Sequence, residues 1–430
     1  MIKLKDVSQP YFILWGSLLL SLAISLTDSI STAHAEEYPA YFSSRTYLGF
    51  YEDMYGNRYA PLYEYFEVEY NRPSNGMKFY SAGWLKYDFR TSGEKRTNSD
   101  LGLAYVTYSP PSDSNLVFNA GRHYVFEGVA SEQIDGVSAR WDFARNTGLS
   151  LYGGIPVETD KDGRDSDTIY GCRLFGRISG KAEAGVSFLR EDNAGIRYRE
   201  EIGLDLWAIP FRGIEIQGIS SYNAITGGFI EHSYSAKAAV SRKITLRGFF
   251  VHSNYRDAFS SATLSVFSPD NIGINGKMTK SGISAEYLIS EGIATTLNYT
   301  GYTYQTSGDA RHYGARLHYK GTDIHAGGAF NRMEGDTARL RYTEMRLYTV
   351  KRLDKHNFSL DFITLRYDRP YNNMNIAYNL NGTAEYVINN NLSASLSIDK
   401  GRDPDYNHFT KVMLSLAYTF KGALSVQAGY

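Results

Sequence analysis

The stretch Met413-Leu414-Ser415-Leu416-Ala417-Tyr418-Thr419-Phe420 alternates large apolar residues with small or polar ones. Successive side chains of a β-strand point to opposite faces, so a period of two gives one apolar face and one wet face. The same pattern recurs in about twenty segments of the chain, with almost no helical periodicity between them. Behind an apparent export signal, this repetition predicts an all-β fold, a closed antiparallel transmembrane β-barrel.

Four segments show the alternation most clearly, and these are Gly136–Phe143, Ile202–Ala208, Arg311–Lys320 and Leu392–Ile398. In a soluble sandwich the apolar face would be core, whereas in a membrane barrel it faces lipid and the polar face lines the lumen. Tyrosines gather near the ends of such segments, where an interfacial aromatic girdle would lie. This distribution favours the membrane barrel.

The expected connections alternate in length, as in outer-membrane barrels with short periplasmic turns and longer external loops. Short ones are expected at 110–114, 145–146, 179–181, 210–212, 290–292, 320–322, 389–391 and 421–422. Longer ones are expected at 52–60, 91–100, 123–135, 158–167, 254–275 and 401–406. A literal count of strands is odd, whereas bacterial barrels have even numbers. Either Lys421–Tyr430 is an extension or a further strand lies at Ser261–Ser268, and we predict about 22 strands.

The first residues resemble a secretory signal. Lys3 and Lys5 give a positive start, Phe12–Leu26 is apolar, and Ala33-His34-Ala35 is a small-x-small cleavage site. We expect residues 1–35 to be a cleaved signal peptide and residues 36–430 to be a single barrel domain. Only residues 36 to about 43 precede the first expected strand, which argues against the plug domain of an energy-coupled siderophore transporter.

Composition excludes several functions. The 430 residues carry a net charge of -1, and such balance argues against a nucleic-acid partner, whose phosphates require clustered Lys and Arg. The single cysteine, Cys172, cannot form an internal disulfide. It also cannot form Cys-x-x-Cys-His, so the chain does not itself attach a c-type haem, and we expect no cofactor.

One segment carries a family resemblance. Two neighbouring stretches are similar to the strand end and the strand start that flank one loop in large Gram-negative outer-membrane porins. They are Ala120-Gly121-Arg122-His123-Tyr124-Val125-Phe126-Glu127-Gly128 and the following Ile134-Asp135-Gly136-Val137. The architecture of the whole mature chain resembles these porins, and the motif covers Asn119 to Phe143. The chain also resembles the barrel component of porin–cytochrome electron conduits. The resemblance therefore implies either a channel or a sheath around a cytochrome.

The polar faces supply the candidate site. If they point inward, the lumen-lining basic residues are Arg140, Arg173, Arg247, His312, Arg316, His318, Arg339 and Arg341. The acidic residues beside them are Glu67, Glu69, Asp88, Asp142, Asp205, Glu215 and Asp361. These charges form either a wall that selects ions or pairs that only rigidify the wall. The net basic segments Arg311–Lys320 and Ala338–Arg346 are the best candidates for a weak anion preference.

Catalytic and metal sites find little support. The acidic loop Asp160–Asp167 offers oxygen ligands for calcium but lacks the closing Glu of the helix–loop–helix pattern, so a solvated external loop is the preferred interpretation. No Gly-x-Ser-x-Gly or His-Glu-x-x-His motif is present. In His232-Ser233 and His252-Ser253 the adjacent side chains of a strand point to opposite faces. We expect no enzyme activity and no metal site.

The main functional hypothesis is a passive diffusion channel for small polar solutes or ions in the outer membrane of a Gram-negative bacterium. The alternative is a barrel sheath for multihaem c-type cytochromes in extracellular electron transfer. In the channel hypothesis the residues Ser261–Asn275, in the longest expected loop, would fold inward as a constriction. Outer-membrane lipid is the expected partner in both cases, and the sequence leaves open whether the barrel forms a homo-oligomer.

Overall fold

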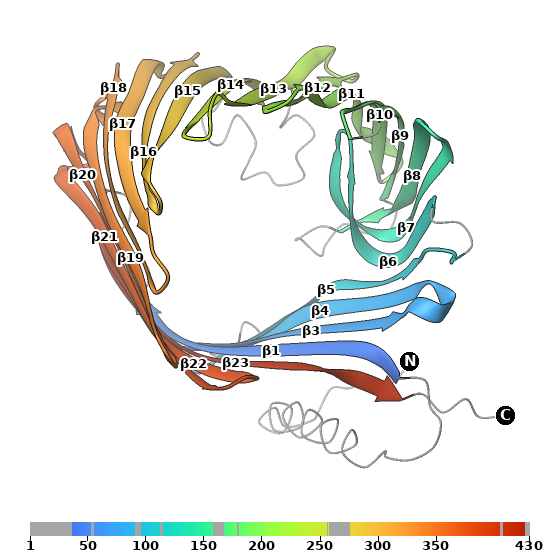
Figure 1. Ribbon diagram of the computed structural model, residues 1–430, viewed down its shortest axis with the longest axis horizontal. Helices are drawn as coiled ribbons and strands as arrows, with labels where there is room; N and C mark the ends of the chain where they lie inside the picture. Colours follow the sequence, from blue (N-terminus) through green and yellow to red (C-terminus); the bar gives the residue numbers. More distant parts are fainter. Residues whose placement is uncertain are drawn as a thin grey trace.

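The computed structural model describes residues 37–52, 56–90, 96–111, 115–157, 167–178, 180–255, 257, 276–404 and 407–425. All strands in this part of the chain belong to one antiparallel sheet of 23 strands. One of them, β2 (Arg58–Tyr59), has only two residues and pairs with the end of β1. The remaining 22 strands form the wall of a closed barrel, as the sequence predicts (Figure 1).

The strands of the wall have the following bounds. They are β1 (Glu37–Glu52), β3 (Pro61–Arg72), β4 (Met77–Asp88), β5 (Thr97–Tyr108), β6 (Leu116–Glu127), β7 (Ala130–Ala144), β8 (Thr147–Pro156), β9 (Thr168–Ile178), β10 (Ala182–Asn193), β11 (Ile196–Phe211) and β12 (Ile214–Asn223). They continue as β13 (Gly228–Ala239), β14 (Ile244–Asn254), β15 (Lys277–Ser290), β16 (Ile293–Tyr304), β17 (Gly308–Lys320), β18 (Ile324–Gly335), β19 (Tyr342–Leu353), β20 (His356–Tyr371), β21 (Met374–Asn389), β22 (Leu392–Asp403) and β23 (Asn407–Ser425). Among the described residues, the 3₁₀ turns η1 (Pro73–Asn75) and η5 (Ala338–Leu340) lie between strands.

The barrel closes between its first and last strands. β1 pairs with β3 along one edge and with β23 along the other, from Glu37↔Ser425 to Tyr51↔Lys411. Closure satisfies the backbone groups that an open edge would leave unpaired, which a spanning sheet requires in lipid. β23 runs straight through 421–422, so the turn predicted there is wrong, and the odd segment in the literal count is the end of this strand. The first strand also begins earlier than expected, at Glu37.

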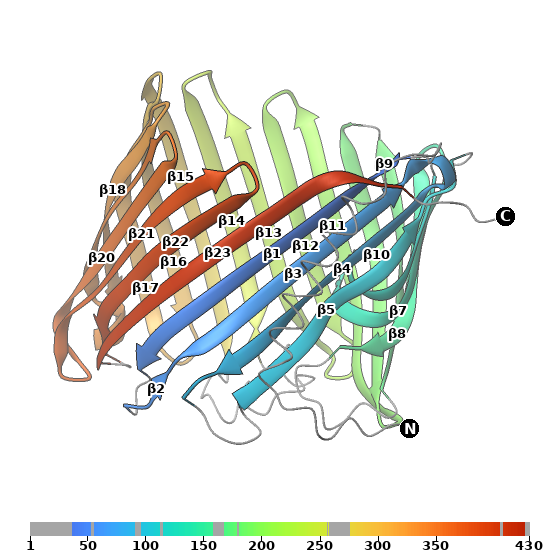
Figure 2. The ribbon, with the colours of Figure 1, turned by 90° about the horizontal axis from the view of Figure 1, so that it is seen from below.

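The connections confirm the predicted alternation in length at most positions. The strand ends that flank the long connections, such as Pro156 and Thr168, lie at one end of the barrel, and tight turns such as 145–146 and 291–292 lie at the other. The described ends of the chain, in β1 and β23, lie at the end with the tight turns (Figure 2). The expected signal peptide, the expected strand Ser261–Ser268 and the expected constriction Ser261–Asn275 lie outside the described residues.

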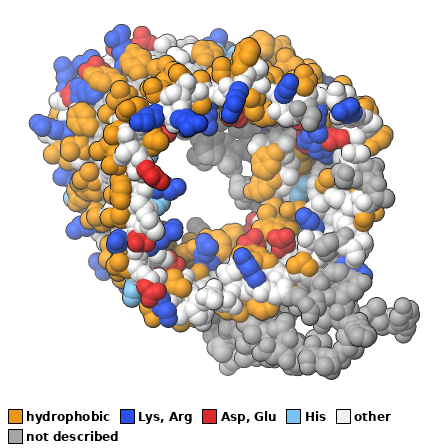
Figure 3. Space-filling view, viewed as in Figure 1, with side chains coloured by type: hydrophobic (Ala, Val, Ile, Leu, Met, Phe, Trp, Pro, Cys, Tyr) orange, Lys and Arg blue, Asp and Glu red, His pale blue; other side chains and the backbone are white. Residues whose placement is uncertain are grey.

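The outer face of the wall is apolar. Leu204, Leu347 and Leu416 expose 58%, 58% and 46% of their surface, although each lies in the middle of a long strand. Apolar side chains cover much of the outer rim in Figure 3, and charged ones also stand on the inner rim. Such exposure would be costly in water and is what a lipid-facing wall requires. Within the described residues no helix has the length and apolar character to cross a membrane.

Candidate functional site in the barrel lumen

The hairpin of β6 and β7 leaves the wall and turns into the barrel. β6 pairs with β5 only from Tyr108↔Phe118 to Ala104↔Arg122, but it pairs with β7 as far as Glu127↔Ala130. Only Gly128 and Val129 join the two strands. The long loop predicted at His123–Asp135 is therefore wrong, because these residues form a regular hairpin whose tip folds inward.

The tip of this hairpin contacts the wall at β10. Gly128 has a φ of +63°, which glycine adopts without strain. A Cβ atom at Gly128 would lie 2.1 Å from Oγ of Ser187, so no larger residue fits here. The backbone N–H of Val129 donates a hydrogen bond to the same Ser187 Oγ, at 3.0 Å. The tip is thus fixed against the inner face of the wall.

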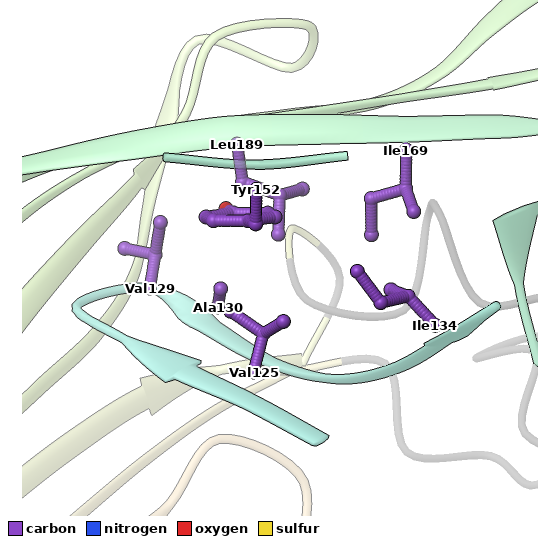
Figure 4. Close-up of a cluster of buried hydrophobic side chains, with 7 residues drawn as sticks. All are labelled: Val125, Val129, Ala130, Ile134, Tyr152, Ile169 and Leu189. Atoms are coloured by element: carbon purple, nitrogen blue, oxygen red, sulfur yellow. The ribbon is translucent and has the colours of Figure 1, made fainter. Parts of the chain in front are cut away.

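An apolar cluster holds the hairpin along its length (Figure 4). The hairpin contributes Val125, Val129, Ala130 and Ile134, and the wall contributes Tyr152 of β8, Ile169 of β9 and Leu189 of β10. Ile134 and Leu189 have no exposed surface. Each large apolar side chain buried in this way stabilises the folded hairpin by about 1.5–3 kcal/mol. The cluster is a small core inside the lumen, and it keeps the hairpin inward.

An ion-pair bridge adds to this attachment. Arg199 of β11 pairs with Glu132 on the hairpin and with Glu201 on its own strand. The side chain of Glu201 is only 6% exposed, whereas that of Glu132 is 26% exposed. A buried carboxylate needs a charged partner, so Arg199 is tied to Glu201 and in turn holds Glu132. This bridge links the hairpin to the wall on the side of β11.

A larger charged cluster lies on the inner face of β7, β9, β10 and β11, and the end of β6 contributes one carboxylate to it. The guanidinium carbons of Arg140, Arg173 and Arg177 lie 4.2, 4.9 and 5.0 Å from the ring centroid of Phe175. Four carboxylates pair with these arginines, those of Glu127, Asp142, Glu183 and Asp205. Arg173 lies at the centre, with its Nη1 2.9 Å from Glu183 and its Nε 3.0 Å from Asp205. The cluster is close to neutral as a whole.

The eight predicted lumen residues fall into four groups. Arg140 and Arg173 belong to the charged cluster, and Arg247 of β14 pairs with Glu286 at 3.3 Å. His312, Arg316 and His318 lie on the face of β17 opposite Leu317, which is 54% exposed, so strand alternation places them inward. Arg339 and Arg341 lie in the connection between β18 and β19, beyond the strand ends. The lumen-lining role of all eight residues stays a prediction.

A cavity of about 1190 Å³ lies between the hairpin and the wall of β1, β3 and β4. We call it the aromatic pocket, because its wall side is lined by the aromatic residues Tyr47, Tyr51, Tyr63, Tyr65, Phe66, Trp84 and Phe409. Tyr124 and Gln133 of the hairpin line it from the other side. The sequence pattern assigned such aromatics to the lipid face, and it did not predict this pocket. Tyr65 lies two residues before the predicted lumen residue Glu67 on β3 and therefore on the same face of the strand. This spacing could have predicted that Tyr65 faces the lumen.

The remaining candidate chemistry is limited. In the acidic loop, residues 158–166 lie outside the described residues, and Oδ1 of Asp167 accepts a hydrogen bond from the N–H of Ala194. Oγ of Ser220 lies 2.8 Å from Nδ1 of His232, and the ring of His232 lies near His252. The contacts of His232 among the described residues include no carboxylate that would complete a serine-hydrolase triad. The described part of the chain also contains no group of three or more metal-ligating side chains.

Comparison with known proteins shows the fold. No protein-family model matches the sequence, and no curated protein does. The siderophore receptor PirA from Pseudomonas aeruginosa aligns over 89% of this chain and 80% of its own, with 9% identity and a TM-score of 0.58. A variant of the ferric enterobactin receptor PfeA from the same organism aligns over 91% and 81%, with 10% identity and a TM-score of 0.56. The P. aeruginosa protein OccK5 (OpdH) aligns over 91% and 99%, with 12% identity and a TM-score of 0.45. The fold is that of a large outer-membrane β-barrel.

Proposed function

We propose that the protein is a passive channel of the outer membrane for small polar solutes. The observation that carries this proposal is a closed wall of 22 strands whose lumen is narrowed, but not filled, by the β6–β7 hairpin. Figure 3 shows an opening through the ring beside this hairpin. A barrel of this size is too wide for its own side chains to fill. Solutes small enough to pass the hairpin would therefore diffuse down their gradient.

The pairing of charges supports weak ion selectivity. Three arginines and four carboxylates neutralise one another in the charged cluster, and Arg346 pairs with Asp361 at 2.5 Å on another part of the wall. Paired charges hold strands together and present little net field to a passing ion. Of the two sequence interpretations, this favours the rigidified wall. A weak anion preference at Arg316 stays part of the proposal.

The sheath for a cytochrome is the second candidate. A cytochrome threaded through the lumen would need the space that the hairpin occupies. The apolar cluster and the Arg199 bridge both hold the hairpin in that space. This favours a channel, and the comparisons offer no support for the sheath.

Two measurements on one preparation test the proposal. The protein is purified gently from its native outer membrane, its absorbance spectrum is recorded, and it is then inserted into planar lipid bilayers. A channel predicts a colourless preparation that produces stepwise conductance. A stoichiometric Soret band would instead mean that a cytochrome came with the barrel, because this chain does not carry c-haem itself.

A further inference from the structure

We infer that the aromatic pocket binds neutral sugars. This inference rests on the proposed channel function and names the class of solute. The pocket contains a continuous run of rings on the inner face of β1, β3 and β4. Tyr47 and Tyr65 meet edge to face at 5.6 Å between centroids, and Tyr65 stacks with Tyr63 at 6.2 Å. Tyr63 in turn lies 6.4 Å from Trp84.

The pocket also has hydrogen-bonding groups, and most of its charged groups are carboxylates. Its charged lining consists of Glu52, Glu67, Asp100 and Asp399 against Arg45 and Lys411. Glu67 accepts hydrogen bonds from Tyr80 at 2.9 Å and from Ser43 at 3.3 Å. Asp399 accepts one from Asn379 at 2.8 Å. Each carboxylate has about four lone-pair sites, so acceptors remain for a ligand.

The combination of rings and carboxylates selects a ligand chemistry. The C–H face of a pyranose packs on aromatic rings, and its hydroxyl groups donate to carboxylates. Arg58 pairs with Glu52 and Arg122 pairs with Asp100, so an anionic solute would meet the other two carboxylates, Glu67 and Asp399, against Arg45 and Lys411 and would gain no net attraction. A wholly apolar solute would desolvate those carboxylates without replacing their hydrogen bonds. A neutral polyol with an apolar face satisfies both kinds of surface.

The hairpin places this surface in the path of solutes. Tyr124 stacks on Phe126 at 5.6 Å between ring centroids, and these side chains are 51% and 69% exposed. They alternate with Val125, which faces the wall, so they point into the remaining lumen. Tyr124 and Gln133 line the aromatic pocket opposite Tyr63 and Tyr65. A sugar crossing the barrel on this side would therefore contact rings on two sides.

The experiment measures binding of a defined neutral sugar. The folded, purified barrel in detergent is titrated with maltohexaose by isothermal calorimetry and by tryptophan fluorescence, since Trp84 lies in the pocket. We expect saturable binding that weakens about tenfold in Tyr63→Ala, which removes the ring between Tyr65 and Trp84. The matched control is Tyr302→Ala on β16, which removes a ring stacked on Tyr304 at 5.8 Å outside the pocket. The control should bind maltohexaose as the wild type does.

Several outcomes would overturn the inference. The first is an absence of saturable maltohexaose binding to the folded barrel. The second is an equal loss of maltohexaose affinity in Tyr63→Ala and Tyr302→Ala. The third is tighter binding of an anionic oligogalacturonate than of maltohexaose. Heat-modifiable migration on gels shows that each variant is folded. Conductance without sugar is recorded on the same preparations. If the wild-type barrel conducts but binds no sugar, the sugar site is refuted and the channel function stands. If it binds sugar but does not conduct, the channel function is refuted and the sugar site stands.

Discussion

Replacing Arg199 with methionine tests whether the hairpin is a separately held element of the lumen. Methionine keeps much of the side-chain length but removes the charge and all five N–H donors. The change breaks the bridge to Glu132 on the hairpin and leaves Glu201, with 6% of its side chain exposed, without this partner. The barrel wall should persist, because its backbone ladder does not depend on this side chain.

The expected magnitude follows from burial. Removing one partner of a buried ion pair typically costs about 3–5 kcal/mol. The side chain of Glu132 is 26% exposed and can be hydrated after the change. We therefore take the lower end of this range and expect the free energy that holds the hairpin against the wall to fall by about 3 kcal/mol. Each 1.4 kcal/mol is a factor of ten, so opening of the hairpin should become about 100-fold more frequent.

Hydrogen exchange followed by mass spectrometry measures this opening. A peptide covering residues 124–134 should exchange about 100-fold faster in Arg199→Met than in the wild type. The matched control is Arg197→Met on the same strand, whose side chain is 52% exposed and pairs with Glu200 at 3.2 Å. An exposed pair contributes at most about 1 kcal/mol, so the control should change exchange by less than about fivefold.

Two results would refute this account of the hairpin. The first is unchanged exchange of the 124–134 peptide in Arg199→Met, which would mean that the bridge contributes nothing to the attachment. The second is equal acceleration in a peptide from β20, on another part of the wall, which would mean that the substitution loosens the whole barrel. Either result would remove the ion pair as a reason for the inward position.

Three further predictions concern the wall. Leu416→Arg places a charge on the lipid face at a cost of about 2–4 kcal/mol near the midplane and should impair folding into bilayers, whereas Ser415→Arg on the lumen face should not; equal folding yields would mean the faces are misassigned. Arg316→Glu should reduce any anion preference, and an unchanged reversal potential would remove β17 from the selective surface. In a chain otherwise free of cysteine, Thr337→Cys should be labelled on intact cells and Asp354→Cys only after permeabilisation, and the opposite pattern would invert the orientation.

The alternation of side chains was sufficient to predict the wall. Leu416 is exposed on the outer face, as a period of two requires, and Oγ of Ser415 on the opposite face bonds Oγ of Ser395 at 2.6 Å. The end of β23 was missed because Lys421 and Gly422 resemble a turn locally. Pairing with Tyr41 and Ala40 of β1 keeps them in the strand, and the local sequence does not contain that partner.

The site was less predictable, for two physical reasons. The hairpin folds inward because Val129 and Ile134 find apolar partners at Ile169 and Leu189, and contacts between such distant residues leave no periodic signal. The aromatic pocket was missed because both faces of β3 carry aromatic and acidic residues. Glu64 lies on the face opposite Glu67, and hydroxyl groups of Ser44 and Thr46 donate to its carboxylate. Composition therefore did not identify the inner face of that strand.

Solute uptake by proteoliposomes tests the central claim most directly, namely that this barrel is a passive channel narrowed by the β6–β7 hairpin. Wild-type protein is compared with a variant in which residues 124–133 are replaced by a short turn, using neutral solutes of increasing size. We predict that the wild type admits small solutes up to a sharp size limit and that the variant admits larger ones. Wild-type vesicles that exclude every solute, or an identical size limit in both proteins, would contradict the account.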